Sequence, residues 1–525
     1  MRRFYAARVA AVAAAILVTA FAAYAGTSSA KSSAVTKTTT SIPGANKGNA
    51  PGVSAKTIKF AVFTQEKTCG TSAADQTTVA GTKERFNTLV KWVNSHIKLP
   101  GGRKLAVEFI DDGGTDPACA DVAQAAITKA IDQDHVFAIF DDNYNPGINV
   151  ADIVAKKHTL IIGWNFQTLH DLKTHAPYGW STYEPGQISF EELTWMIQKR
   201  FKKNQYVADD GSKHARVWGE LFTDNTLGHA LANLTKGYMT QGGLSVKQYF
   251  ISPVASTASQ QASGLVLQMQ QAGVNSLIYG ADDLTSDLSF NAAATNAGYH
   301  PDFFISQYGT IPQLTVFVPY FGANFEKRLY GTGPPNIQAE RVEVDSAGDV
   351  NPKSCPSCYG QDNGMNVAAV TAYEQAHGSA GDHPGIDSWN FAPFIWSDLM
   401  TLTMGAANAG PTLNAYTFQY GLEHGAQSQC MAQEFFGKQP YAQAAKFSFS
   451  NPPRNYLMSG FTTLHFNPNV KNAYGTMGLF ESYDNYQLFN SLSSLPANPL
   501  YNTASAGGYK LVKQKGNITV NTKCG

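Results

Sequence analysis

The stretch RKLAVEFIDDGGTDPACADVAQAAITKAIDQDHVFAIF, residues 103–140, decides the fold of this chain. Its residues 104–110 alternate into an apolar run that stops at the turn-forming DDGG of residues 111–114, which predicts a strand. Small apolar side chains then recur at every fourth position, as a helix face requires: Val122, Ala126 and Ala130. A second short apolar run covers residues 136–140. Strand, helix and strand within about forty residues is the size of a βαβ unit, so the sequence predicts a parallel sheet.

The same unit repeats on both sides of this stretch. Apolar runs that predict strands recur at residues 58–63, 104–110, 136–140 and 159–162, and again at 216–222, 246–251, 276–279 and 302–306. Helical patterns separate most of them, so we expect two successive βα sheets between residues 57 and 310. The last two hundred residues repeat less cleanly. Helices are expected at 366–375 and 389–407 and short strands at 462–466 and 477–483, as additions to the first two units.

Length and charge restrict the kind of protein. A chain of 525 residues is too long for one hydrophobic core and suits two or three domains. Lys and Arg together balance Asp and Glu at 39 each, so the formal net charge is zero, and only 15% of the residues are charged. This balance gives no electrostatic reason to expect a nucleic acid or an anionic membrane surface as partner.

The first 25 residues have the pattern of an export signal. Arg2, Arg3 and Arg8 precede the apolar residues 9–23, and a small-x-small sequence follows at residues 23–25. An uncleaved membrane anchor is the alternative, although the apolar run is short for a span. Residues 26–55 are rich in Ser, Thr, Ala, Gly and Pro and are expected to form a flexible linker. The protein is therefore expected outside the cytosol, in the periplasm, the cell envelope or the medium.

Six cysteines lie in the expected exported part: Cys69, Cys119, Cys355, Cys358, Cys430 and Cys524. An even number outside the cytosol suggests up to three disulfides, although six cysteines permit fifteen pairings. Cys69 and Cys119 each follow a predicted strand on neighbouring parallel strands, so we pair them. Cys355 and Cys358 are expected to form a local disulfide rather than a redox or zinc pair. Cys430 and Cys524 then pair by elimination.

Sequence signatures of enzymes are absent. The first strand is not followed by GxGxxG, and no GxxxxGK[ST], HExxH or GxSxG sequence occurs. Asp111 and Asp112 are adjacent at a strand end, so they point to opposite sides and are expected to cap helix amides rather than share an acid–base role. His170 and His175 lie in a segment expected to be loop-like, with nothing to complete a metal site. We expect no catalytic residues, no metal and no cofactor.

The loops expected at the carboxyl ends of the strands suggest a binding cleft. Open α/β sheets bind ligands beyond these ends, and two facing sheets would enclose a ligand between them. These loops are rich in aromatic, amide and carboxylate groups: Asn143-Tyr144-Asn145, Trp164-Asn165-Phe166, Asp224-Asn225, Tyr279, Asp282-Asp283 and Gln307-Tyr308. Aromatic rings would supply apolar walls, amides and helix N-termini would hold a carboxylate, and an Asp would pair with an ammonium. Ordinary turn chemistry is the other explanation, because Asn and Asp favour turns.

Several segments resemble a known family. Residues 52–63, the PGGR turn at 100–103, Asp111-Asp112 with Asp116-Pro117, and residues 136–140 are similar to the opening of extracellular solute-binding proteins of ABC transporters. The branch is that of leucine/isoleucine/valine-binding proteins, with the type I periplasmic binding fold. The sequence DNTLG at 224–228 resembles the opening of a second-lobe helix in that family, where a ligand-facing Tyr usually occupies the position of Leu227. The resemblance covers roughly residues 52–412.

The resemblance implies an α/β architecture of two Rossmann-like lobes with parallel central sheets, joined by hinge crossings. The implied segments are a signal peptide (1–25), a linker (26–55), the first part of lobe 1 (56–181), lobe 2 (182–334), the return to lobe 1 (335–460) and strands that complete lobe 2 (461–525). The implied ligand-binding residues are Thr64, Asn143, Tyr144, Trp164, Asn165, Leu227, Tyr279, Asp282 and Tyr308.

For function, the resemblance implies an exported, monomeric solute receptor and not an enzyme. It would bind an amino-acid-like or other carboxylate or amide solute and deliver it to an ABC permease in the membrane by closing its two lobes. The alternative is an envelope sensor or structural module that keeps the fold without feeding a transporter. Leu227 and the expanded C-terminal part motivate that alternative.

Overall fold

The structure is a computed structural model of the chain. It describes residues 42–64, 69, 76–113, 119–141, 148–163, 168–182, 184–281, 284–306, 328–333, 369, 372–373, 375–377, 395–424, 449, 454–457, 460–471, 477–482 and 489–497. Within this part of the chain, no helix is both long enough and apolar enough to cross a bilayer.

The first sheet has five parallel strands in the order β2-β1-β3-β4-β5. They are β1 (Thr57–Thr64), β2 (Lys104–Asp111), β3 (Ala138–Asp141), β4 (Leu160–Gly163) and β5 (Gly179–Ser181). β1 pairs with β2 on one side and with β3 on the other. The parallel sheet predicted from residues 103–140 is confirmed.

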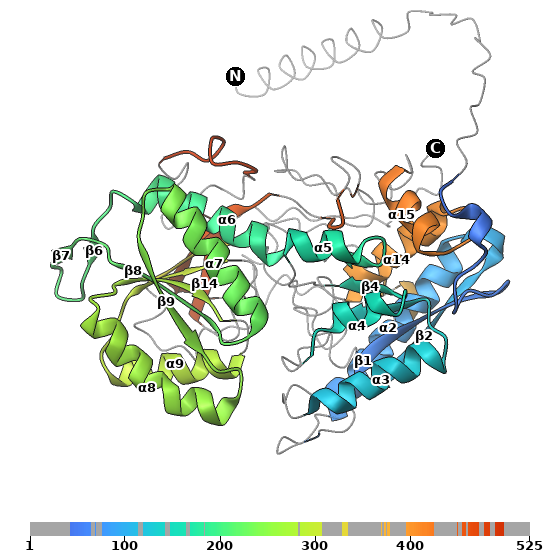
Figure 1. The fold of residues 1–525 in the computed structure, drawn as a ribbon, viewed down its shortest axis with the longest axis horizontal. Helices are drawn as coiled ribbons and strands as arrows, with labels where there is room; N and C mark the ends of the chain where they lie inside the picture. The colour runs from blue at the N-terminus through green and yellow to red at the C-terminus, as the bar shows by residue number, and fades with distance from the viewer. Residues whose placement is uncertain are drawn as a thin grey trace, which may run out of the picture. The chain divides into compact units, whose positions relative to one another are not determined.

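Helices cover both faces of this sheet (Figure 1). They are α2 (Gln76–His96), α3 (Ala120–Asp132), α4 (Val150–Lys156) and α5 (Leu169–His175). Side chains of β1 alternate between the faces: Phe60 and Val62 join the cluster that contains α2, whereas Ala61 and Phe63 join the cluster of α3 and α4. Burial on both faces explains why β1 is a nearly continuous apolar run.

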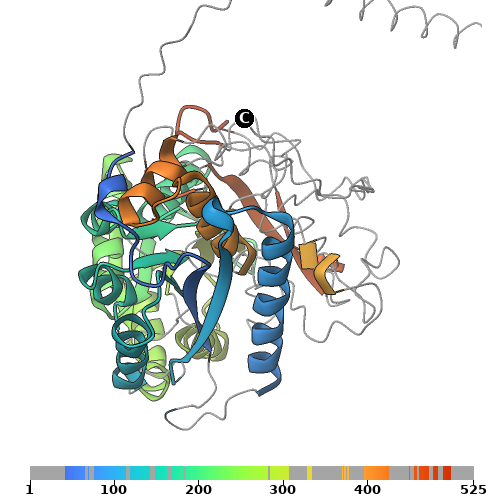
Figure 2. The same cartoon turned by 90° about the vertical axis from the view of Figure 1, so that its right-hand side faces the viewer.

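Two helices from much later in the chain complete the first core. α14 (Ser397–Asn408) and α15 (Ala415–His424) contribute to the same buried cluster as α2. The Trp396 ring packs edge-on against Trp92 of α2, with ring centroids 5.5 Å apart. Figure 2 shows α2 running alongside β1 and β2. Residues more than three hundred positions apart in the sequence therefore share one core.

The second sheet has seven strands in the order β14-β13-β12-β11-β10-β8-β9. They are β8 (Trp218–Thr223), β9 (Val246–Ile251), β10 (Ser276–Gly280), β11 (Asp302–Ile305), β12 (Leu329–Gly333), β13 (Thr462–Lys471) and β14 (Met477–Ser482). The pairs from β9 to β12 are parallel, whereas β13 is antiparallel to both of its neighbours. The strands expected at 462–466 and 477–483 are thus confirmed, as a C-terminal extension of this sheet.

The second sheet is also covered on both faces. α8 (Ala255–Gln271) and α9 (Leu284–Asn296) lie side by side on one face (Figure 1). α6 (Gly186–Met196), which continues into a π-helical turn at Ile197–Phe201, and α7 (Thr226–Gln241) cover the other face. Both sheets therefore have the three-layer α/β arrangement expected from the sequence.

Short elements are where the sequence predictions were wrong. The segment of His170 and His175, expected to be loop-like, is the helix α5, which begins with a capping box formed by Thr168 and Asp171. His175 is buried, and its Nε2 lies 2.7 Å from Asp152 Oδ1. A two-stranded hairpin of β6 (Tyr206–Val207) and β7 (Lys213–His214) was not predicted at all.

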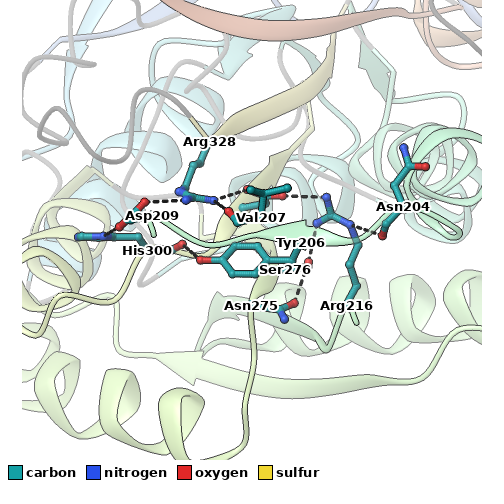
Figure 3. A network of polar contacts seen from close by, with 10 residues as sticks. Asn204, Tyr206, Val207, Asp209, Arg216, Asn275, Ser276, His300 and Arg328 are labelled. Carbon is teal, nitrogen blue, oxygen red and sulfur yellow. Dashed lines mark hydrogen bonds and ion pairs between the residues drawn. The ribbon is translucent and has the colours of Figure 1, made fainter. Parts of the chain in front are cut away.

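An ion-pair network joins this hairpin segment to the second sheet (Figure 3). Asp302, at the start of β11, lies 2.8 Å from an Arg216 guanidinium nitrogen and 3.2 Å from one of Arg328. Arg328 also pairs with Asp209 at 2.6 Å, and His300 Nδ1 contacts the same carboxylate. The side chains of Asp302 and Arg216 are only 5% and 6% exposed, so their charges depend on each other for compensation.

Replacing Asp302 should destabilise the second sheet strongly. Asp302→Asn leaves two largely buried guanidinium groups without their shared carboxylate, and we expect a loss of about 3 kcal/mol in the free energy of unfolding. Urea denaturation of the purified chain measures this loss. Asp210→Asn is the matched control, because Asp210 is exposed and accepts a hydrogen bond from Ser212 N–H that an asparagine can still accept. Equal stability losses in the two variants would contradict the role given to Asp302.

The structure brings Cys69 and Cys119 together. The Sγ atom of Cys119 lies against the main-chain carbonyl oxygen of Cys69. The Cys69 N–H donates to the Gly113 carbonyl at 2.9 Å, which fixes the first cysteine at the carboxyl edge of β2. The disulfide between them is not formed in this structure, and their pairing stays a prediction. Cys355, Cys358, Cys430 and Cys524 lie outside the described residues.

Oxidation of the purified chain should join Cys69 to Cys119. The bond would close a loop of 50 residues, which corresponds to a stabilisation of about 4 kcal/mol. We expect a non-reduced peptide map to contain one peptide pair joined through these cysteines. Cys119→Ser should unfold at lower urea concentration than the parent in oxidising buffer, and at a similar concentration with reductant present. Alkylation of both thiols in the oxidised, folded protein would exclude the pairing.

Candidate functional site

Both sheets share one strand order, and this order points to the site. The parallel part of the second sheet, β9-β8-β10-β11-β12, repeats the order β2-β1-β3-β4-β5 of the first. In each case the order reverses between the first strand of the unit and the third, which are β1 and β3 in one sheet and β8 and β10 in the other. Connections leave to opposite faces at such a point, and open α/β sheets bind their ligands at the carboxyl ends of the strands beside it, in what is called here the crevice.

In the first sheet, the crevice is bordered by Thr64 and Asp141. Thr64 ends β1, as expected, and is buried; its hydroxyl donates to the Ile110 carbonyl at 3.2 Å. Asp141 ends β3 and is half-buried beside Gly163, its partner on β4. A Cβ atom on Gly163 would lie 2.9 Å from the main-chain N and O of Asp141. The close approach at this edge therefore requires glycine at 163.

In the second sheet, the corresponding segment is Thr223, Asp224 and Asn225, where β8 passes into α7. Asp224 N–H donates to the Ile251 carbonyl at 2.7 Å, which extends the pairing of β8 with β9. The Asn225 side chain accepts a hydrogen bond from Gly228 N–H at 2.7 Å and thereby caps α7. This bond satisfies one of the amide groups that a helix N-terminus leaves without an intrahelical partner.

Gly228 allows α7 to start directly against the end of β8. A Cβ atom at this position would lie 2.0 Å from the carbonyl oxygen of Thr223, closer than any side chain can come. The glycine of the DNTLG sequence thus has a steric role. It brings the positive end of the α7 dipole to the carboxyl edge of the sheet, where an anion would be stabilised.

An imidazole and a carboxylate lie together at this helix end. His229 Nε2 is 2.8 Å from Asp224 Oδ1, and both side chains are about half exposed, at 48% and 51%. The His229 ring also stacks on Phe250, with centroids 3.9 Å apart. Because the pair is accessible to solvent and held in place by stacking, it offers a carboxylate and an imidazole to a solute. The sequence analysis missed His229, although its place in the first turn after the Asn225 cap was a usable signal.

Of the nine predicted ligand-binding residues, three lie in the described part of the chain. Thr64 stands at the strand end, where it was expected. Leu227 is half-buried in the first turn of α7 and packs against the apolar cluster of α6 and α7. The other six lie outside the described residues: Asn143, Tyr144, Trp164, Asn165, Asp282 and Tyr308.

Tyr279 is a core residue in this structure, which corrects the expectation that it faces a ligand. It is 1% exposed and packs against Phe290 and Phe303, with ring centroids 5.9 and 6.1 Å away. Alternation along β10 explains the difference, because Leu277 and Tyr279 point to the face covered by α8 and α9. Gly280 follows it at the crevice, where a Cβ atom would lie 2.3 Å from the Phe222 ring.

A buried carboxyl pair lies where the chain passes between the sheets. Glu184, just before α6, accepts a hydrogen bond at 2.7 Å from the N–H of Gly460, just before β13. This bond ties the outgoing segment to the returning one. Glu192 is 2% exposed, and burial together with the neighbouring Glu184 carboxyl raises the pKa of Glu192 well above its ordinary value. Glu192 therefore keeps its proton to a higher pH than an exposed carboxyl group does.

Another buried carboxyl lies on β8, three residues before Thr223. Glu220 is fully buried on the face covered by α6 and α7, and its Oε1 accepts a hydrogen bond from Gln248 Nε2 at 2.7 Å. Burial raises the pKa of Glu220 to about 8, and the Gln248 hydrogen bond opposes part of this rise. The strand that carries the candidate site thus holds a carboxyl group that is mostly protonated at neutral pH.

The raised pKa predicts a direction for the pH dependence of stability. An acid with a higher pKa in the folded state binds more protons when folded, so its stabilising effect is lost as pH rises from about 4.5 towards 8. The slope from this group is at most about 1.4 kcal/mol per pH unit. Glu220→Gln keeps the hydrogen bond and removes the titration. We expect urea denaturation to find the variant more stable than the parent at pH 8, and the two similar at about pH 5.

No group of three or more His, Cys, Asp or Glu residues in the described part of the chain is arranged to hold a metal ion. The candidate site therefore rests on strand ends, a helix N-terminus and the pair formed by Asp224 and His229. Such an arrangement can bind and orient a small polar solute.

Comparisons with known proteins agree with this geometry. Residues 57–316 match the family model for periplasmic binding proteins. Among curated proteins, none matches this sequence. A solute-binding protein of an ABC transporter from R. palustris, in complex with 4-hydroxybenzoate, is 12% identical, with a TM-score of 0.53 over 83% of this chain and 98% of that chain.

Two further solved structures show the same fold. A solute-binding protein of an ABC transporter from Rhodopseudomonas palustris HaA2, in complex with p-hydroxybenzoic acid, is 12% identical, with a TM-score of 0.52 over 85% of this chain and 99% of that chain. A substrate-binding protein of an ABC transporter from Aeropyrum pernix is 13% identical, with a TM-score of 0.51 over 81% of this chain and 94% of that chain. Taken with the family match, these results assign residues 57–316 of the chain to the periplasmic binding protein family.

Proposed function

We propose that this protein is the exported substrate-binding component of an ABC-type uptake system. It binds a small carboxylate or amide solute, performs no chemistry on it and delivers it to a membrane permease. The observation that carries the proposal is the repeated strand order of the two sheets, which reverses between β1 and β3 in one and between β8 and β10 in the other. Open α/β sheets bind their ligands at the carboxyl ends of such strands, which supports a solute site there. Each crevice carries polar groups fixed by main-chain contacts.

The α7 N-terminus supports a solute that carries a carboxylate. Main-chain amides and the helix dipole favour negative charge there, and Gly228 keeps this end of the helix against the strand. Two solved relatives contain 4-hydroxybenzoate, an aromatic carboxylate, which agrees with this class of solute. Asp224 adds a half-exposed negative charge beside the same helix end, and this charge suits an ammonium group on an amino-acid-like solute.

Export and the partner protein follow from the same proposal. The basic and apolar residues 1–25 have the composition of an export signal, so the binding lobes function outside the cytosol. The protein acts as a monomer, captures its solute by closing the two lobes, and presents the closed form to the permease. Closure is favoured because only the closed form contacts the solute from both sheets.

Removing the charge of Asp224 should affect an amino-acid solute and a plain carboxylate differently. Asp224→Ala should weaken the binding of an amino-acid solute about fivefold, because it removes the partner of the ammonium group. The same change should leave the binding of a plain carboxylate such as 4-hydroxybenzoate unchanged or strengthen it, because it removes a repelling charge. Titration calorimetry of the full chain with branched-chain amino acids and aromatic acids measures both effects.

Asp132→Ala is the matched control for this experiment. Asp132 is also half exposed, at 49%, and its carboxylate also forms one ion pair, at 2.6 Å with Lys157. This residue ends α3, away from the strand ends, so the change should leave solute affinity unaltered. Small-angle scattering supplies the second readout, with compaction expected on solute binding. A chain that binds none of these solutes and does not compact would favour the alternative, a sensor or structural module with the same fold.

A further inference from the structure

A second cavity lies apart from the strand ends that carry the proposed function. Its volume is about 550 Å³, within the range of small-molecule sites. The walls come from α5, α6 and α7 and from the returning segment at residues 454–456. None of the strand-end residues Thr64, Asp141, Thr223 or Asp224 is part of the described lining.

The walls are held in place by hydrogen bonds between the elements. Gln187 of α6 accepts from Leu169 N–H of α5 at 3.2 Å and donates to the Tyr238 hydroxyl of α7 at 3.1 Å. The returning segment is fixed to β5, because Ser181 N–H donates to the Asn455 carbonyl at 2.8 Å and the Asn455 amide donates to the Gly179 carbonyl at 3.0 Å. A cavity with walls fixed in this way loses little conformational freedom on binding a ligand.

The lining combines an apolar surface with positive charge. Leu169 and Leu172 of α5 and Leu234 of α7 supply the aliphatic part, and Tyr456 adds an aromatic ring. Arg454 lies over the Tyr456 ring at 4.6 Å and donates to the Leu457 carbonyl at 2.9 Å, which holds its guanidinium group at the cavity.

The remaining charged group of the lining, Lys173, and the imidazole of His170 come from α5. Lys173 and His170 are exposed at the cavity, and none of the described lining residues is acidic. The acid of α5, Asp171, lies outside this lining and accepts hydrogen bonds from Thr168 in the capping box of the helix. Positive groups next to an aliphatic and aromatic wall suit an anion that carries an apolar body.

We propose that this cavity is a second ligand site, which takes a small carboxylate with an apolar body. The carboxylate lies between Lys173 and Arg454, and the apolar body lies against Leu169, Leu172 and Leu234. The site uses helices of both sheets and lies apart from the strand ends that carry the proposed solute site. A ligand there contacts α5 on one side and α6 and α7 on the other.

The experiment uses sodium octanoate as the probe and the full chain in titration calorimetry. Lys173→Glu should weaken octanoate binding about tenfold, because an attraction becomes a repulsion. Leu169→Trp should abolish binding by filling the cavity, while the Leu169 main-chain hydrogen bond to Gln187 remains. Lys199→Glu is the matched control, because it makes the same change of charge at an exposed lysine that does not line the cavity. The Lys199→Glu variant should bind octanoate with the same affinity as the parent.

Circular dichroism of each variant verifies that the fold is intact. Octanoate affinity that is equal in the parent, Lys173→Glu and Leu169→Trp would overturn the proposal, as would an absence of binding to the parent. Binding that these two variants leave intact and that Asp224→Lys alters would place octanoate at the strand ends. That result would overturn the second site and leave the proposed function standing. The reverse result, loss only in the cavity variants, supports the second site whatever the strand ends bind.

Discussion

The central constraint in this protein is the burial of β1 and β8 on both faces. Each is paired on both sides by parallel strands and covered on both faces by helices, so their side chains alternate between two apolar clusters. Chain connections must then leave the sheet over opposite faces next to these strands. The crevice at their carboxyl ends is a geometric result of the strand order, and polar groups at Thr64 and Asp224 lie there because the strands end there.

How far the sequence could predict this fold depended on burial. Strands buried on both faces read as continuous apolar runs, so residues 58–63 and 136–140 were assigned correctly. β5 (Gly179–Ser181) is three residues long and owes its existence to pairing with β4, which leaves no periodic pattern to detect. α5 was missed for a related reason, since its seven residues carry little apolar periodicity. The capping signal of Thr168 and Asp171 was present, but it was not used.

The candidate site was predictable in position but less so in detail. The expectation that ligand contacts follow the strand ends rests on topology, and Thr64 and the turn at Asp224 and Asn225 lie at such ends. Tyr279 illustrates the limit: it sits next to the strand end, yet the alternation of β10 points its ring into the core beside Phe290. Applying the two-residue period of a strand to residues 276–280 would have predicted that the Tyr279 side chain points into the core. The stacking of His229 on Phe250 depends on the packing of α7 against β9, which no local pattern encodes.

The steric fit at Gly228 limits how the binding chemistry of this lobe can evolve. Any side chain there would collide with the Thr223 carbonyl and move the helix away from the strand. Residue 228 therefore has to remain glycine if the helix is to keep this position. New solute preferences must arise at its neighbours, Asp224, Leu227 and His229, whose side chains are at least partly exposed. A library that randomises these three positions and leaves residue 228 unchanged would test altered solute specificity. It would also keep the N-terminus of α7 against the end of β8.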